Sequence, residues 1–165
     1  MSDVKRLHDE DFVLWSAQQA QALRAAARAG SNELLDWENL AEEIEGLGIS
    51  QRSAMQSQIR RIIRHLLKLQ FSQARDPRRG WIESINDARG EVEHLLETSP
   101  SLRTSLAGDL DAETGRAIRQ AVQDLRAYGE IGEEAAVLRT ARYTAEQVLG
   151  IARTTGIFSP LRCSM

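Results

Sequence analysis

Apolar residues recur along the chain at intervals of three and four, the spacing that lines one face of an α-helix. The strict alternation of apolar and polar residues that indicates a strand is scarce. Ala, Leu, Glu, Arg and Gln, which favour helix, are abundant, and there are three prolines. The pattern therefore predicts an all-α fold, a single-domain helical bundle of five to seven helices.

Capping residues and helix breakers divide this pattern into segments. Asp36 and Ser50 are candidate N-caps, and Gly30 and Gly48 are candidate helix ends. Residues 50–71 carry a broad apolar face, so we expect them to form the central helix. The predicted helices cover residues 9–30, 36–48, 50–71, 81–97 and 99–129, with Gly108 as a candidate kink, and a short last helix opens with the capping box of Thr144 and Gln147.

The length of 165 residues suits one domain. We expect a flexible amino-terminal segment over residues 1–8, a single helical domain over residues 9–155 and a flexible tail over residues 156–165. Cys163 is the only cysteine, which excludes an intrachain disulfide and a cysteine-based metal site. Because there is neither a signal peptide nor a long apolar run, we expect a cytoplasmic protein with no membrane contact.

The net charge of −3 hides an uneven distribution. Residues 1–50 carry four Lys/Arg against ten Asp/Glu, and residues 81–165 carry nine against thirteen. Residues 51–80 instead carry eight Lys/Arg against one Asp/Glu. Only this middle block is basic, so any site for an anionic partner is expected there.

The basic block includes a ridge of cations on the predicted central helix. Arg60, Arg64 and Lys68 are spaced by four residues and lie opposite the Ile/Leu face. Such a ridge can bind phosphates or an acidic protein, or it can pair with the acidic helix before it and stay structural. Nucleic acid is disfavoured without being excluded, because no aromatic residue is interleaved to stack on bases. The predicted binding residues are Arg60, Arg61, Arg64, Lys68, Arg78 and Arg79.

The stretch DWENLAEEIEGLG, residues 36–48, concentrates five carboxylates on one short helix. Three readings stay open: a hydrated helix edge, which is the common reason for such a pattern, an oxygen-ligand metal site, or a partner-binding edge. No nucleophile elbow, P-loop or dinucleotide fingerprint is present. The Glu-x-x-His sequence at residues 91–94 lacks the second copy that a di-iron bundle needs. We therefore predict no metal and no cofactor, and the sequence leaves enzymatic activity undecided.

The segments HDEDFVLW, DWENLAEEIEGLG, HLLKLQF and WIESINDARGEVEHLLETSPSL, taken in order, resemble the bacterial domain-of-unknown-function family numbered twenty-nine. The resemblance covers about His8 to Leu106 and implies an all-helical fold with no established activity. His8 and Leu69 depart from the family pattern, where Tyr and Trp are expected. The family-like polar residues could form one polar site if they met in a cleft between helices. The candidates for such a site are Asn39, Glu42, Glu43, Glu45, His65, Lys68 and Gln70.

Three hypotheses follow for a protein of unknown function. The first is a small helical interaction module that binds, through its basic helix face, an acidic protein partner. The second is a metal-dependent or general acid/base enzyme that uses the region of Glu42, Glu45 and His65. The third is nucleic-acid binding through the basic surface of residues 60–79. The sequence does not indicate the oligomeric state.

Overall fold

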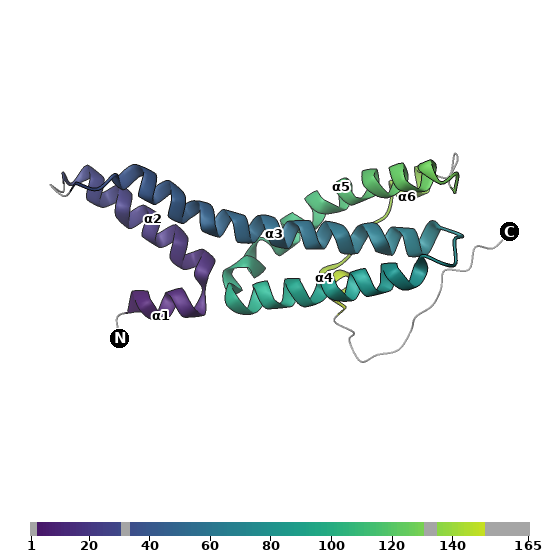
Figure 1. The fold of residues 1–165 in the computed structure, drawn as a ribbon, viewed down its shortest axis with the longest axis horizontal. Helices are drawn as coiled ribbons and strands as arrows, with labels where there is room; N and C mark the ends of the chain where they lie inside the picture. The colour runs from purple at the N-terminus through teal and green to yellow at the C-terminus, as the bar shows by residue number, and fades with distance from the viewer. Residues whose placement is uncertain (1–2, 31–33, 131–134, 151–165) are drawn as a thin grey trace.

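A computed structural model of the chain (Figure 1) describes residues 3–30, 34–130 and 135–150. Every element in these ranges is helical, which confirms the all-α prediction, and none of the helices is long and apolar enough to cross a membrane. The predicted tail, residues 156–165, and Cys163 lie outside the described residues. The elements are α1 (Asp3–Glu10), α2 (Phe12–Arg28), α3 (Trp37–Phe71), α4 (Arg78–Thr98), the 3₁₀ helix η1 (Pro100–Thr104), α5 (Leu106–Ala127), α6 (Ala135–Leu138) and α7 (Ala145–Leu149).

The long helix α3 runs through the whole molecule. It spans 35 residues, or about 50 Å at 1.5 Å per residue. The prediction of two helices that separate at Gly48 is wrong, because α3 continues through Gly46 and Gly48 without a break. Asp36 does cap this helix, as predicted, and accepts a hydrogen bond from the backbone N–H of Asn39.

Gly48 serves close helix packing rather than helix termination. A Cβ atom added at Gly48 would lie 2.2 Å from Oγ of Ser16 on α2, and Ser16 itself is buried. The absence of a side chain therefore lets α2 approach the backbone of α3 at this point. Gly46, two residues earlier, has no atom within 4 Å of the same added Cβ.

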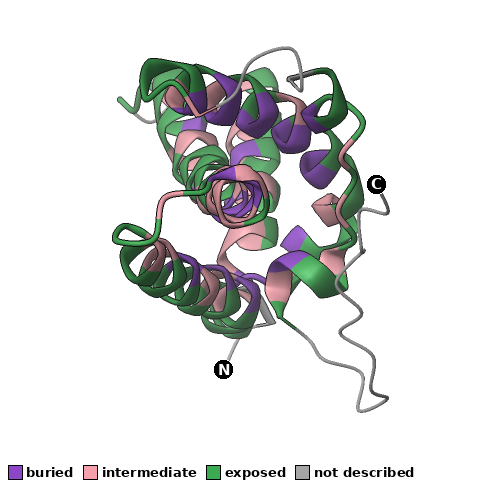
Figure 2. Cartoon of the chain, turned by 90° about the vertical axis from the view of Figure 1, so that its right-hand side faces the viewer, coloured by how far each residue is buried: buried purple, intermediate pink, exposed green. Residues whose placement is uncertain are grey.

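The main core lies around the second half of α3, as predicted for the central helix. Buried residues occupy the inward faces of the helices (Figure 2). α4 and α5 pack against α3, and single residues of α6 and α7, Leu138 and Val148, complete the cluster. The fully buried core residues of α3 are Met55, Ile59, Ile62, Ile63 and Leu67.

A two-helix arm projects from this core (Figure 1). We define the arm as α2 together with residues 37–51 of α3, which pack against each other. The large buried residues of α3 begin at Met55, whereas the buried residues of the arm are small: Ser16, Ala20, Ala41 and Gly48. The arm therefore consists of one layer of two helices held together by close backbone approach.

Asp11 joins the base of the arm to the rest of the molecule. The helix predicted over residues 9–30 is divided here into α1 and α2, so part of the segment expected to be flexible, residues 3–8, is helical. The buried Asp11 carboxylate accepts a hydrogen bond of 2.9 Å from the backbone N–H of Leu14, which caps α2. It also accepts bonds from the backbone N–H and the hydroxyl of Ser101 in η1. This dual role explains why the helix break falls at Asp11 and not at Asp9.

The later helix boundaries agree with the sequence in most places. Gly129 has a φ of 68° and follows α5, and the capping box of Thr144 and Gln147 is formed at the start of α7. The chain between α4 and α5 breaks at Ser105, after η1, and not at Gly108, which lies inside α5. The prediction of one domain over residues 9–155 stays a prediction, with α3 shared by the arm and the core.

Replacing the two α3 glycines with alanine separates helix propensity from close packing. Gly46→Ala is expected to raise the free energy of unfolding by about 0.5 to 1 kcal/mol, because alanine favours helix and meets open space. Gly48→Ala is expected to lower it by about 1 kcal/mol, because the new methyl group displaces the Ser16 hydroxyl. Urea unfolding of both variants measures the difference. An equal gain in both would show that α2 does not approach α3 as described.

Candidate functional site

The three cations at the centre of the predicted ridge face α5. Arg60 donates to the Glu113 carboxylate at 3.1 Å, and Glu113 is 0% exposed. Arg64 binds both oxygens of Asp124, at 2.7 and 2.8 Å, and Nζ of Lys68 lies 2.6 Å from the same carboxylate. These cations therefore hold α5 on α3.

The other three residues of the predicted ridge also contact groups of the chain. Nε of Arg61 donates to the hydroxyl of Ser84 on α4 at 2.8 Å. Arg78 donates to the backbone carbonyls of Leu69 and Ser72, so it caps the end of α3. Arg79 pairs with Glu83, one turn later, on the exposed surface of α4. Each of the six cations thus has an intramolecular partner.

A row of carboxylates on α5 forms ion pairs with cations of α3. Asp109, Glu113 and Asp124 fall on one side of α5, since their spacings of four and eleven residues are near whole turns. Asp109, the third member, accepts two hydrogen bonds from Arg52 and one each from Gln56 and Ser105. We call these contacts between α3 and α5 the charge ladder. The pairing with α5 is not predicted from the sequence, although the spacings of eight and four residues from Arg52 to Arg60 and Arg64 place these cations on one side of α3.

Electrostatics within the ladder favour the ionised forms of Asp109 and Asp124. Burial by itself would raise the pKa of Asp124, but the hydrogen bonds and positive charges of Lys68 and Arg64 lower it below its usual value. Burial opposes ionisation of Asp109 in the same way, and the bonds from Arg52, Gln56 and Ser105 lower its pKa overall. The ladder is therefore a set of paired charges at the boundary of the core.

The carboxylates of residues 36–48 lie on the arm and are mostly exposed. Glu42 and Glu43 are exposed, and Asn39 donates to Asp36 at the helix start. Glu45 accepts a hydrogen bond of 2.7 Å from Arg24 of α2, and this bond lowers the pKa of Glu45. The Arg24–Glu45 ion pair therefore links the two helices of the arm across one face.

The structure does not bring the predicted polar-site residues together. Glu45 and His65 lie on the same continuous helix, and their separation of twenty residues corresponds to about 30 Å. Gln70 is exposed near the end of α3. Within the described ranges, no three His, Cys, Asp or Glu side chains are grouped so that they could hold a metal ion. One chain therefore does not form a single site from Glu42, Glu45 and His65.

His65 is partly buried beside the charge ladder. Its Nδ1 atom is buried and has no hydrogen-bond partner in the described part of the chain. Burial, followed by the positive charges of Lys68, Arg64 and Arg61, lowers the pKa of His65 to about 4, and Asp124 opposes this only in part. The imidazole is therefore neutral near pH 7.

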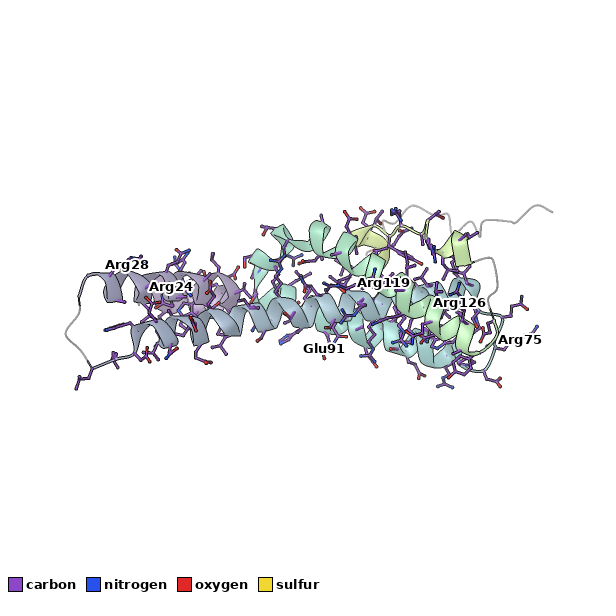
Figure 3. The ribbon with its side chains drawn as sticks, turned by 90° about the horizontal axis from the view of Figure 1, so that it is seen from above. Arg24, Arg28, Arg75, Glu91, Arg119 and Arg126 are labelled. Atoms are coloured by element: carbon purple, nitrogen blue, oxygen red, sulfur yellow. The ribbon has the colours of Figure 1, made fainter. Side chains whose placement is uncertain are left out.

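The two faces of the arm differ in chemistry. Residues two apart on a helix point about 200° apart, so Ala22 and Ala26 lie opposite Arg24, and Leu47 lies opposite Glu45. Figure 3 shows Arg24 and Arg28 on the arm, far from Arg119 and Arg126 on α5. We call the face with Arg24, Glu38, Glu42 and Glu45 the charged arm face. The apolar arm face consists of Trp15, Ala22, Ala26, Trp37, Leu40, Ile44 and Leu47.

Comparison with known proteins identifies the family. The model described as "Domain of unknown function DUF29" matches residues 7–151, so the chain belongs to this family and the resemblance seen in the sequence is confirmed. The crystal structure of an alpha-helical protein of unknown function from Rhodospirillum rubrum ATCC 11170 is 24% identical, with a TM-score of 0.70 over 86% of this chain and 88% of that chain. This likeness shows a shared helical fold. No curated protein matches the chain.

Truncating the buried carboxylate of the ladder is expected to be costly. Glu113→Ala leaves Arg60 and Arg116 without their acceptor and should lower the free energy of unfolding by about 3 kcal/mol. Glu83→Ala removes the exposed partner of Arg79 and should cost less than about 0.5 kcal/mol. Urea unfolding compares the two. Similar small losses would mean that the ladder does not hold α5.

His65 makes stability depend on pH in a defined window. The unfolded chain takes up a proton at this residue below its ordinary pKa of 6.5, whereas the folded chain does so only near pH 4. Stability is therefore lost as the pH falls from 6.5 towards 4, by about 2 kcal/mol for this partly buried ring.

The variant His65→Gln removes this titration. Between about pH 7.5 and about pH 4.5 it should lose about 2 kcal/mol less stability than the wild type, because glutamine takes up no proton. His94→Gln, at an exposed position on α4, serves as the matched control and should behave like the wild type. An identical pH dependence in both variants would disprove the role of His65.

Proposed function

We propose that this member of the DUF29 family is a non-catalytic helical interaction module that forms a reversible dimer through the apolar arm face. The observation that carries the proposal is the exposure of large apolar residues on a single layer of two helices. Leu40 is 39% exposed and Leu47 is 51% exposed, although both belong to the apolar stripe of α3. A second layer of helices would bury this stripe.

The arm has the geometry of half a four-helix bundle. Its two helices are antiparallel neighbours, with small residues at their contact and apolar residues along one side. A second arm laid against the apolar face would complete a four-helix arrangement. The charged arm face would stay in water on both copies, so no unpaired charge would be buried.

A second copy of the chain is the partner that this chemistry favours. The apolar arm face contains no charged residue, so it offers nothing specific to the acidic protein expected from the sequence. The six predicted binding cations between residues 60 and 79 have partners within the chain. A twofold axis would place the same apolar stripe on both sides of the interface, so each copy would bury the same apolar surface.

The size of the face supports a reversible association. Two helices of about 16 residues cover roughly 25 Å by 20 Å, or about 500 Å² of footprint on each copy. This is below the roughly 800 Å² for each partner that is standard for stable complexes. The dimer is therefore expected to dissociate on dilution. The proposal places the protein in the cytoplasm, where its single cysteine would stay reduced.

Polar substitutions on the two arm faces test this proposal. The double variant Leu40→Gln/Leu47→Gln should weaken the dimer at least about tenfold, because each change removes a buried apolar contact from both copies. Ile49→Gln is the matched control, since Ile49 is 59% exposed on the charged arm face, two residues from Leu47. Sedimentation equilibrium over a range of concentrations measures the dissociation constant. A monomeric wild type, or equal weakening by Ile49→Gln, would disprove the proposal.

A further inference from the structure

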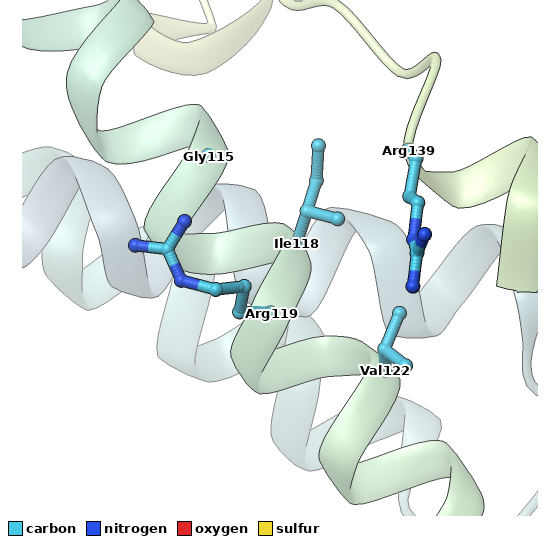
Figure 4. Close-up of a pocket in the computed structure, with 5 residues that line it drawn as sticks. All are labelled: Gly115, Ile118, Arg119, Val122 and Arg139. Carbon is cyan, nitrogen blue, oxygen red and sulfur yellow. The ribbon is translucent and has the colours of Figure 1, made fainter.

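An open cavity lies on the flank of α5 that faces away from α3. Its volume is about 430 Å³, within the range of pockets that take small molecules. Figure 4 shows the lining residues Gly115, Ile118, Arg119 and Val122 on α5, with Arg139 at the end of α6. Ile118 and Val122 belong to the hydrophobic core and expose only their edges, so they form an apolar floor.

Two arginines border this floor without a carboxylate partner. Neither Arg119 nor Arg139 makes an ion pair in the described part of the chain, whereas every cation of the ridge is engaged. Figure 4 places their side chains on opposite sides of Ile118. Arg126 continues the same side of α5 as Arg119, seven residues later, and it too makes no ion pair with the residues that the structure describes.

Further positive charge lies next to Arg139. Nη1 of Arg142 donates to the backbone carbonyls of Arg139 and Ala141, so its charge is not neutralised by a carboxylate there. Three of the four acidic residues of α5 (Asp109, Glu113 and Asp124) face α3 in the charge ladder. The fourth, Asp111, is exposed and lies four residues before Gly115, on the cavity side of the helix. The cavity therefore has a net positive border and an apolar floor.

Gly115 keeps one end of the cavity open. It lies in the interior of α5, where glycine is disfavoured, and no helix packs closely against it. The nearest atom to an added Cβ would be Nη1 of Arg119, at 3.8 Å. A larger residue here would fill the space beside Ile118 without meeting the backbone of another helix.

We propose that this cavity binds a small amphiphilic anion, a molecule with a hydrocarbon body and a carboxylate or phosphate group. The guanidinium groups of Arg119 and Arg139 match the planar oxygen pairs of these acids. Ile118 and Val122 contact the hydrocarbon. The volume of the cavity suits one small molecule rather than a protein segment. Because α5 lies outside the arm, this site and the proposed dimer can fail independently.

Calorimetric titration of the full chain with four probes tests the ligand chemistry. Decyl phosphate and decanoate, both below their micelle concentrations, should bind saturably with one molecule to each chain. Inorganic phosphate and decanol should bind at least about tenfold more weakly, because each lacks one of the two contacts. Saturable binding of neither amphiphile would overturn the proposal, and so would equal binding of decanol or inorganic phosphate.

Substitutions then locate the site. Arg119→Gln/Arg139→Gln should weaken decyl phosphate binding at least about tenfold, and Gly115→Leu should abolish it while the helical circular dichroism is retained. Arg28→Gln, an exposed arginine near the tip of the arm, is the matched control and should bind like the wild type. Unchanged binding in the double variant, or an equal loss in the control, would overturn the assignment to this cavity.

Discussion

The charge ladder between α3 and α5 determines how the second half of the molecule is arranged. Carboxylates such as Glu113, which has no exposed surface, are stable in the folded chain only if cations reach them. Arg52, Arg60 and Arg64 supply these cations at intervals of eight and four residues, so they fix both the rotation and the register of α5 on α3. Once the acidic side of α5 faces α3, its opposite side has to face outwards, and that side carries Arg119 and Arg126.

The ladder also defines where the arm begins. Asp109 and Arg52 form the ion pair of the ladder that is nearest to the amino terminus of α3. Before this point α3 packs mainly against α2, and the large core residues that start at Met55 are absent. One continuous helix thus has two environments: its second half is enclosed by α4 and α5, and its first half, in the arm, packs mainly against α2. The exposed leucines of the arm result from this change in enclosure, because the apolar stripe of α3 continues where the covering helices have ended.

The sequence predicts local features well and nonlocal ones poorly. Helix class, the cap at Asp36 and the capping box of Thr144 depend on neighbouring residues, and the structure confirms them. The prediction at Gly48 is wrong, because a glycine that ends a helix and one that admits another helix look alike until the partner, Ser16, is known. The same wrong prediction divides α3 into two helices, and only two separate helices could bring Glu45 and His65 into a common cleft. Continuous helical geometry keeps them about 30 Å apart.

Surface charge is also a nonlocal property that the sequence predicts poorly, since the net charge of a segment does not give the charge of its surface. Residues 51–80 are the most basic part of the sequence, yet Arg60, Arg64 and Lys68 point at carboxylates from another helix. Residues 81–165 are acidic in sum, but three of their carboxylates are used in the ladder. What remains on the outer flank of α5 is net positive, with Arg119 and Arg126 against Asp111. A surface for anions therefore arises from a segment with negative net charge, because folding pairs the opposite charges and leaves the unpaired arginines exposed.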